Sequence, residues 1–298
     1  MKKIIYNIPP QLQQLITLSI VLIFGKITAN IYLSWIDIAS VILSAILIEH
    51  LFVYIKTKHI AYFSYSALST AIGVMLMMVT PHIWIYLILV FIALWQKNFL
   101  RIRGRHFFNP SNFALMMGLI LFYKDSHIVL GQLGDELWLG VLVVLLGFFI
   151  LIRVERWLIP IAFTVAYLWL EYIFVVQYDP VLIMEEVLYR FYSVSFLVFV
   201  LFMLTDPITT PSKAWQQIIF AFLVAMIAVL LDRLIGFRVQ HLFMALFLLS
   251  TLIPLLMLWN DTRDKKQLYA ITSIMLFLAV SAIIFIEIQP PYYFDMEG

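Results

Sequence analysis

The stretch LWLGVLVVLLGFFILI, residues 137–152, contains no charged side chain, and runs of this kind recur along the whole chain. Since about 20 apolar residues in a helix cross the roughly 30 Å hydrocarbon core of a bilayer, these runs predict membrane-spanning helices. The composition agrees, with 64% hydrophobic residues, 12% charged residues and a mean hydropathy of +1.02. Soluble domains carry about 25% charged residues. The chain is therefore predicted to be an all-α, polytopic membrane protein.

The same composition excludes several kinds of site. The chain has no cysteine, so disulfides, thiolate zinc sites, cysteine-ligated iron–sulfur clusters and cysteine nucleophiles are excluded within it. The formal net charge of +2 is too small to suggest nucleic acid as a partner, and the basic residues lie between the apolar runs. Lysines and arginines in such positions orient helices in the membrane.

Eleven apolar runs are separated by polar interruptions, and each run predicts one transmembrane helix. The runs lie near residues 13–33, 35–55, 62–80, 82–97, 107–123, 136–152, 157–176, 187–205, 214–232, 240–259 and 268–287. The fourth and fifth runs are short and separated by a polar stretch. A tilted or broken helix is tolerated at membrane depth only where protein surrounds it.

The distribution of basic residues predicts the orientation. When the interruptions are assigned to alternate sides, 14 of the 19 Lys and Arg residues fall on the side of the N-terminus and five on the other. The positive-inside rule makes the richer side cytoplasmic. An odd number of helices then places the C-terminus outside.

The least ordinary polar stretch runs from Lys97 to Phe113 and leads into an apolar helix. Asn109 followed by Pro110 is typical of a helix N-cap with proline at the first helical position. Free N–H groups there, near Arg103 and Arg105, would form an anion site for a phosphate, a carboxylate or a reduced flavin ring. In the alternative interpretation, these arginines only anchor a cytoplasmic helix end.

A second polar stretch, residues 202–211, contains Thr205, Asp206, Pro207 and Thr209. Its prolines break the helix and leave carbonyls and hydroxyls that could bind an ion or a ring with several acceptors. The alternative is a capped cytoplasmic turn. The stretch is unusually polar for a boundary between two apolar helices, which favours a function.

Among the acidic residues of the apolar runs, Glu49 and Glu171 are interpreted as lying at membrane depth. A charge at the centre of a membrane helix costs about 2.5–3.5 kcal/mol on insertion scales, so such residues are candidates for function. Glu49, with His50 beside it, is interpreted either as a polar contact inside the bundle or as a protonatable site. Glu171 is interpreted as an interfacial residue near the end of its run.

A weak internal repeat is present. Tyr65-Ser66 opens a run that closes with Met78-Val-Thr80-Pro81, and Tyr192-Ser193 opens a run that closes with Met203-Leu-Thr205-Asp-Pro207. The two runs are the third and the eighth. An offset of five helices places the copies in opposite orientations, as in inverted-topology repeats that hold a site at their interface.

At these motifs the sequence resembles the NqrB/RnfD family, the membrane subunits of the sodium-pumping NADH:quinone reductase and of the Rnf complex. The resemblance rests on several stretches in the same order, which are residues 64–68, 97–113, 134–137, 156–160 and 202–211. Residues 104–113 and 202–207 look closest to the UnbU branch, named from enediyne biosynthetic clusters. Such a protein is a multi-pass subunit of the bacterial inner membrane, at most one part of an oxidoreductase complex.

The resemblance implies a fold of two inverted five-helix repeats, similar to urea transporters, here residues 1–123 and 124–259. Residues 260–298 would add one transmembrane helix and an external tail. It also implies a noncovalent flavin, riboflavin or FMN, and electron transfer toward quinone, in some complexes with ion movement. Carried over motif by motif, the residues expected around the flavin are Lys97, Asn109, Pro110, Thr205, Asp206, Pro207 and Thr209.

One departure from the family matters. Respiratory members hold a second flavin esterified to a threonine on the external connection after the fifth helix, but residues 124–134 contain no threonine. A covalent FMN is therefore not expected there. Two other interpretations stay open: a transporter or channel without redox chemistry, with Glu49 and Asp206 in the ion pathway, and an UnbU-like accessory protein of a biosynthetic cluster.

Overall fold

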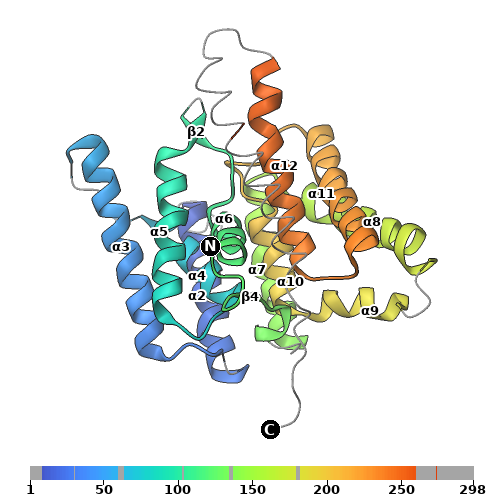
Figure 1. Ribbon diagram of the computed structural model, residues 1–298, viewed down its shortest axis with the longest axis horizontal. Coiled ribbons are helices and arrows are strands. Elements are labelled where there is room, and N and C mark those ends of the chain that lie inside the picture. The colour runs from blue at the N-terminus through green and yellow to red at the C-terminus, as the bar shows by residue number, and fades with distance from the viewer. Residues whose placement is uncertain are drawn as a thin grey trace, which may run out of the picture.

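The computed structural model describes residues 9–29, 31–59, 64–102, 104–133, 137–178 and 182–259, together with residue 273 (Figure 1). The described chain is almost entirely helical. Its helices are α2 (Pro10–Thr28), α3 (Trp35–Thr57), α4 (Tyr65–Met77), α5 (Ile83–Phe99), α6 (Pro110–Leu121), α7 (Leu137–Arg153), α8 (Leu158–Glu171), α9 (Met184–Tyr189), α10 (Val194–Val198), α11 (Ala214–Ile235) and α12 (Gln240–Trp259). Two π-helices, η2 (Tyr172–Val176) and η4 (Phe199–Met203), continue α8 and α10, and the 3-10 helices are η1 (Leu130–Leu133) and η3 (Arg190–Tyr192). The strands are β1 (Met78–Val79), β2 (Arg101–Ile102), β3 (Arg105–His106) and β4 (His127–Ile128).

The helices are apolar on their outer faces as well as on their inner ones, which identifies lipid as their surroundings. On α3, Val41 and Ala45 are completely buried, whereas Leu43, Leu47 and Leu51 are more than half exposed. A soluble helix would carry polar residues on its exposed face. The prediction of an all-α membrane protein is confirmed for the described chain.

The first ten predicted runs each fall on described helical segments, and the eleventh, residues 268–287, lies outside the described residues apart from residue 273. Four described helices are long and apolar enough to cross a membrane alone: α2, α3, α8 with η2, and α11. The segment from Met184 to Met203 would be a fifth span if its two parts, bent by 72°, are counted together. The apolar helices α4, α5, α6 and α7 are shorter, with 12 to 17 residues each.

The shortest of them, α4 and α6, have 13 and 12 residues, which is about 20 Å at most of helix length. The extended chain that follows them forms a small antiparallel sheet, in which Met78 of β1 lies opposite Ile128 of β4. The side chain of Gln132 also donates a hydrogen bond to the Met75 carbonyl, at 3.2 Å. The backbone that leaves the broken helices is thus satisfied by protein, as a non-helical segment in a membrane requires.

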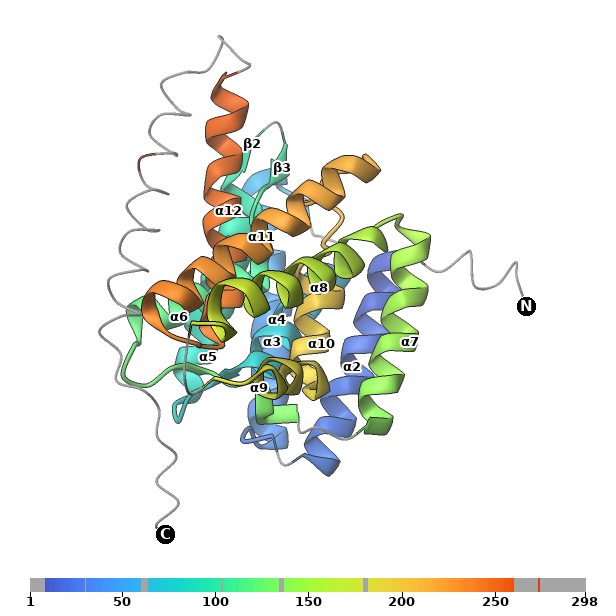
Figure 2. The ribbon, with the colours of Figure 1, turned by 90° about the vertical axis from the view of Figure 1, so that its right-hand side faces the viewer.

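Helix packing recurs with an offset of five. In the described chain α3 packs on α5 and α8 packs on α11, while α6 packs on α5 and α12 packs on α11. At the centre, α2 contacts α7 and α6 contacts α12 (Figures 1 and 2). The pattern fits two five-helix repeats. Their boundaries, their inverted relation and the sidedness of the termini stay predictions.

Local sequence explains where the short helices begin. The Ser64 hydroxyl caps α4 by accepting a hydrogen bond from the Ala67 amide, and the Asn109 side chain caps α6 by accepting one from the Asn112 amide. These caps satisfy N–H groups that have no partner within a helix. The N-cap predicted from Asn109 and Pro110 is confirmed.

Gly73 tests the close packing of the two short helices. A Cβ atom on Gly73 would lie 2.6 Å from the Ser111 hydroxyl, so Gly73→Ala forces α4 and α6 apart. We expect it to lower the free energy of unfolding by about 1–3 kcal/mol, measured as thermal denaturation in detergent. The control is Gly140→Ala, whose Cβ would meet Leu197 at an ordinary 3.4 Å. Equal melting temperatures for both variants would contradict the packing.

Candidate functional site

The two polar stretches predicted from the sequence meet at one end of the helix bundle. The Asn109 side chain donates a hydrogen bond to the Met203 carbonyl at 3.3 Å, which joins the start of α6 to the end of η4. Beside this contact, His106 Nε2 lies 3.8 Å from Asp206 Oδ2. Residues nearly a hundred positions apart in the chain therefore form one polar site.

The start of α6 is held on its other side by α12. The Asn112 side chain donates a hydrogen bond to the Phe243 carbonyl at 3.1 Å, and Asn112 is almost completely buried. The aromatic rings of Phe108 and Phe247 stack next to it, with centroids 5.1 Å apart. The position of Asn109 is thus fixed by both halves of the chain.

The second stretch is a tight turn, defined here as the 206–210 turn. Asp206 accepts a hydrogen bond on its side chain from the Ile208 amide at 3.0 Å, and its carbonyl accepts one from the Thr210 hydroxyl at 2.7 Å. Arg156 holds the turn from outside: its Nε donates to the Thr210 hydroxyl at 3.0 Å and its Nη2 to the Pro207 carbonyl at 3.4 Å. The predicted capped turn is therefore present.

Arg156 brings a positive charge to this turn. Burial lowers the pKa of the Arg156 guanidinium from its ordinary value, while the nearby carboxylates of Glu155 and Asp206 raise it. An arginine keeps its charge in a protein under such opposing influences. The charge therefore stays beside Asp206.

The first cavity at the site, the inner pocket, lies between α2, α4, α6 and the start of the 206–210 turn. It has a volume of about 80 Å³. It is lined by Gln11, Gln14, Leu18, Ser66, Ser69, Thr70, Gly73, His106, Asn109, Pro110, Ser111, Val198, Phe202, Met203, Asp206, Pro207 and Ile208. Four of the predicted residues, Asn109, Pro110, Asp206 and Pro207, are in this lining.

The chemistry of the inner pocket differs from the predicted anion site. Its wall carries the Asp206 carboxylate together with hydroxyl and amide groups, and Arg105 does not line it. A carboxylate at the start of α6 already complements the positive end of the helix. The inner pocket is therefore suited to water or to a small cation rather than to an anion, and it is too small for a flavin ring.

The second cavity, the outer pocket, lies on the other side of His106 and has a volume of about 520 Å³. It is lined by Ile102, Arg105, His106, Phe107, Ile208, Thr209, Thr210, Pro211, Trp215, Gln216, Ile219, Phe220, Leu223 and Leu249. The predicted residues Arg105 and Thr209 are among them. Ligand pockets in proteins are typically about 300–1,000 Å³, mostly apolar, with a few polar groups, and this cavity has that character.

Three other predicted residues lie elsewhere. Thr205 donates its hydroxyl to the Leu201 carbonyl at 2.6 Å and lines a separate cavity of about 140 Å³ between α2, α7 and η4. Arg103 lies outside the described residues. Lys97 lines none of these three cavities.

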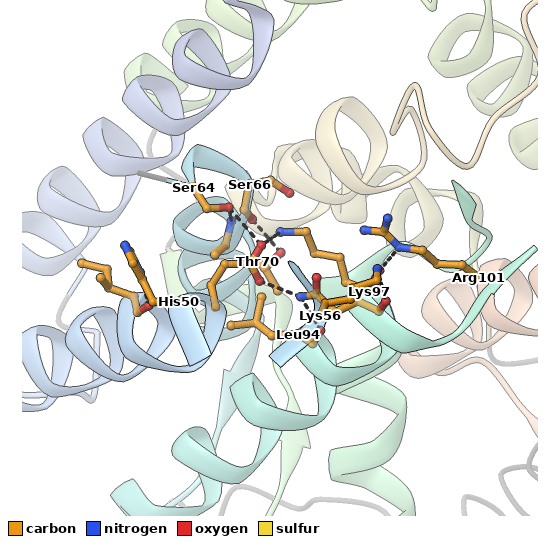
Figure 3. A network of polar contacts seen from close by, with 12 residues as sticks. His50, Lys56, Ser64, Ser66, Thr70, Leu94, Lys97 and Arg101 are labelled. Carbon is orange, nitrogen blue, oxygen red and sulfur yellow. Dashed lines mark hydrogen bonds and ion pairs between the residues drawn. The ribbon is translucent and has the colours of Figure 1, made fainter. Parts of the chain in front are cut away.

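Lys97 instead belongs to a buried cluster around Glu49. Its ammonium group lies 2.8 Å from Glu49 Oε1, and the other carboxylate oxygen accepts a hydrogen bond from the Asn98 side chain at 2.8 Å. The Ser64 hydroxyl adds a hydrogen bond at 3.2 Å. Figure 3 shows Lys97 extending toward Ser64, with Lys56 and Arg101 at the edge of the same network.

This cluster bears on the two interpretations of Glu49. The side chains of Lys97 and Glu49 are only 8% and 6% exposed, so the ion pair closes inside the bundle. A carboxylate with a cation and two hydrogen-bond donors is a polar contact that joins α3, α4 and α5. This geometry favours the polar-contact interpretation.

Glu171 also differs from its interpretation as an interfacial residue. Its side chain is completely buried between α8 and α11, next to Asp232. Glu171 lies near the end of an apolar run, which suggested an interfacial position. Its burial depends on the neighbouring helix α11, and no pattern within the run reveals that neighbour.

Sequence reasoning missed His106, Arg156 and Trp215 as site residues. His106 lines both pockets, and it directly follows Arg105 in the unusual polar stretch of residues 97–113. Arg156 belongs to one of the motifs of the family resemblance, but its contact with Thr210 spans 54 positions. For Trp215, no signal separates it from the other tryptophans of the chain.

The comparison with known families gives one match. The profile of the NQR2, RnfD, RnfE family matches residues 123–266, which include α7 to α12, the 206–210 turn and most of the outer pocket's lining. No curated protein matches the chain. The match is to the family that the motifs predicted, while the UnbU branch stays a prediction.

The Glu49–Lys97 pair gives a test by double-mutant cycle. Lys97→Met leaves a buried carboxylate without its cation, so we expect it to cost about 3–5 kcal/mol of stability, measured by thermal denaturation in detergent. The double variant Glu49→Gln/Lys97→Met removes both charges and should recover most of this loss. If the stability losses of the single variants Lys97→Met and Glu49→Gln simply add in the double variant, the pair makes no buried contact.

Proposed function

From the match of residues 123–266 to the NQR2, RnfD, RnfE family, we propose that the protein is a membrane subunit that binds a noncovalent flavin and relays electrons within a larger complex. The premise supports a multi-pass membrane protein of Rnf- or Nqr-type complexes. The flavin, the electron transfer and any coupled ion movement are parts of the proposal.

The outer pocket is the observation that carries the proposal. At about 520 Å³ it has the volume for a tricyclic ring, and it joins the two stretches that the motifs point to, through Arg105 and Thr209. The inner pocket, at about 80 Å³, has no such room. We therefore assign the flavin to the outer pocket, on the apolar side of His106.

The side chains that line the outer pocket suit the chemistry of a flavin. Trp215 and Phe107 offer aromatic faces to a planar ring. The guanidinium of Arg105 would offset negative charge on the ligand, and Thr209 and Gln216 supply hydroxyl and amide groups for its polar edge. A flavin in this position would supply electron transfer, while the residues of the chain bind and orient it.

A relay needs a donor and an acceptor, which this chain does not supply by itself. We propose other redox subunits of the complex as neighbours, with quinone as one possible acceptor. The broad apolar outer faces of α3 and α7 leave room for such helices or for lipid.

Flavin content of the purified protein tests the proposal directly. Protein extracted in mild detergent should show flavin absorbance and fluorescence, and Trp215→Ala should weaken flavin affinity by up to about tenfold through loss of an aromatic contact. Trp169→Ala is a matched control, because both tryptophans are 58% exposed but Trp169 lies on α8 away from the pocket. Wild-type protein without flavin would refute the proposal.

One observation favours a second function. The inner pocket has the size and the oxygen groups for a small cation, with Asp206 as its carboxylate. A transporter or channel without redox chemistry would use this pocket.

Ion flux into liposomes separates the two functions. If the second function holds, flux should proceed without any reductant and be abolished in Asp206→Asn, while the neutral change Gln216→Ala in the outer pocket leaves it unchanged. Flux that requires a reductant would support the redox function instead.

A further inference from the structure

A second buried cluster of charged groups lies between α8, α11, α12 and η3, away from both pockets. Asp232, on α11, is its centre. Its Oδ1 accepts hydrogen bonds from His241 Nδ1 at 2.6 Å and from the Arg238 amide at 2.9 Å, and its Oδ2 lies 3.3 Å from Arg190 Nη1. Arg190 also donates a hydrogen bond to the Tyr167 hydroxyl. Every oxygen of Asp232 thus has a donor, as an ionised carboxylate requires.

Glu171, on α8, has Asp232 and Tyr167 as its electrostatic neighbours. Its side chain is 0% exposed, and both of its oxygens lack a hydrogen-bond donor among the described residues. An ionised carboxylate without donors in such surroundings costs several kcal/mol. Glu171 therefore needs something that the described side chains do not provide.

The donors of the cluster are shared unevenly. Two carboxylates, Glu171 and Asp232, lie in it, and both Arg190 and the buried His241 are bonded to Asp232. Glu171 is the carboxylate left without a donor among the described residues. By contrast, Glu49 and Lys97 match one carboxylate with one cation on the equivalent helices of the first half, α3 and α5.

We propose that the Glu171–Asp232 pair is a proton-binding site, which holds one proton on the Glu171 carboxyl. The proton gives Glu171 a donor for Asp232 or the Tyr167 hydroxyl, and it removes the charge of a carboxylate that has no described partner. It binds without any change in oxidation state. This inference is independent of the flavin.

Among the described residues, no other titratable group has a hydrogen bond to Glu171, and Arg238, which follows α11, bonds Asp232 through its backbone amide. Arg233 on α11 is exposed, with its guanidinium over the ring of Tyr178. Glu185 and Glu186 on α9 are exposed carboxylic residues. Tyr172, the first residue of η2, is also exposed.

Infrared spectroscopy tests the protonation state. The full-length protein in a detergent without ester groups should show the carbonyl stretch of a buried carboxylic acid, shifted in D₂O, and Glu171→Gln should abolish it. Glu185→Gln, which changes an exposed carboxylate on a neighbouring helix, should leave it unchanged. Asp232→Asn should also abolish the band, because Glu171 can then ionise against Arg190.

Stability gives a second readout. A group that binds a proton in the folded state and releases it on unfolding loses its contribution as the pH rises, so the melting temperature of the wild type should fall from neutral to alkaline pH. Glu171→Gln keeps a neutral group and should flatten this fall, whereas Glu185→Gln should not.

Two results would overturn the proposal. The first is a carboxylic acid band that survives in Glu171→Gln. The second is a melting temperature that rises with added sodium chloride, but not with choline chloride, in the wild type and not in Glu171→Gln, which would place a metal cation at Glu171 instead of the proton. The flavin content plays no part in either measurement.

Discussion

The whole structure depends on one constraint: within the bilayer, a charge or a free backbone group must find its partner in the protein. Over most of the described chain, helices satisfy the backbone groups. Where a helix breaks, hydrogen bonds to another segment of the chain satisfy them. The β1–β4 sheet closes the ends of α4 and α6, and the hydrogen bond from Asn109 to the Met203 carbonyl closes the break after η4. Polar groups at membrane depth therefore lie where helices break or where neighbouring helices bond each other through their side chains.

The same constraint explains what the sequence could and could not predict. Apolar runs locate the described helices, and the side chain of Asn109 identifies the start of α6, because both signals are local. The partner of Lys97 is not local: Glu49 lies 48 positions away on another helix, so nothing within residues 97–113 identifies it. Glu171 shows the same limit, since its burial is produced by α11 and cannot be read from α8 alone.

At the candidate site, different elements form the two pockets. α4 and α6 bring hydroxyl and amide groups to the inner pocket, whereas the β2–β3 hairpin and the start of α11 form the larger, apolar cavity. Gly104, with a φ of 79°, allows the hairpin to reverse and to place Arg105 and His106 beside the 206–210 turn. Arg156 then fixes that turn from the side of α8.

His106 and Ile208 belong to the walls of both pockets, so the two cavities share part of their lining. A ligand that displaced either side chain from one side would change the shape of the space on the other. Thermodynamic reciprocity would then require each occupant to alter the affinity of the other by the same factor. The shared wall is thus the place in the fold where occupancy of one compartment would be communicated to the other.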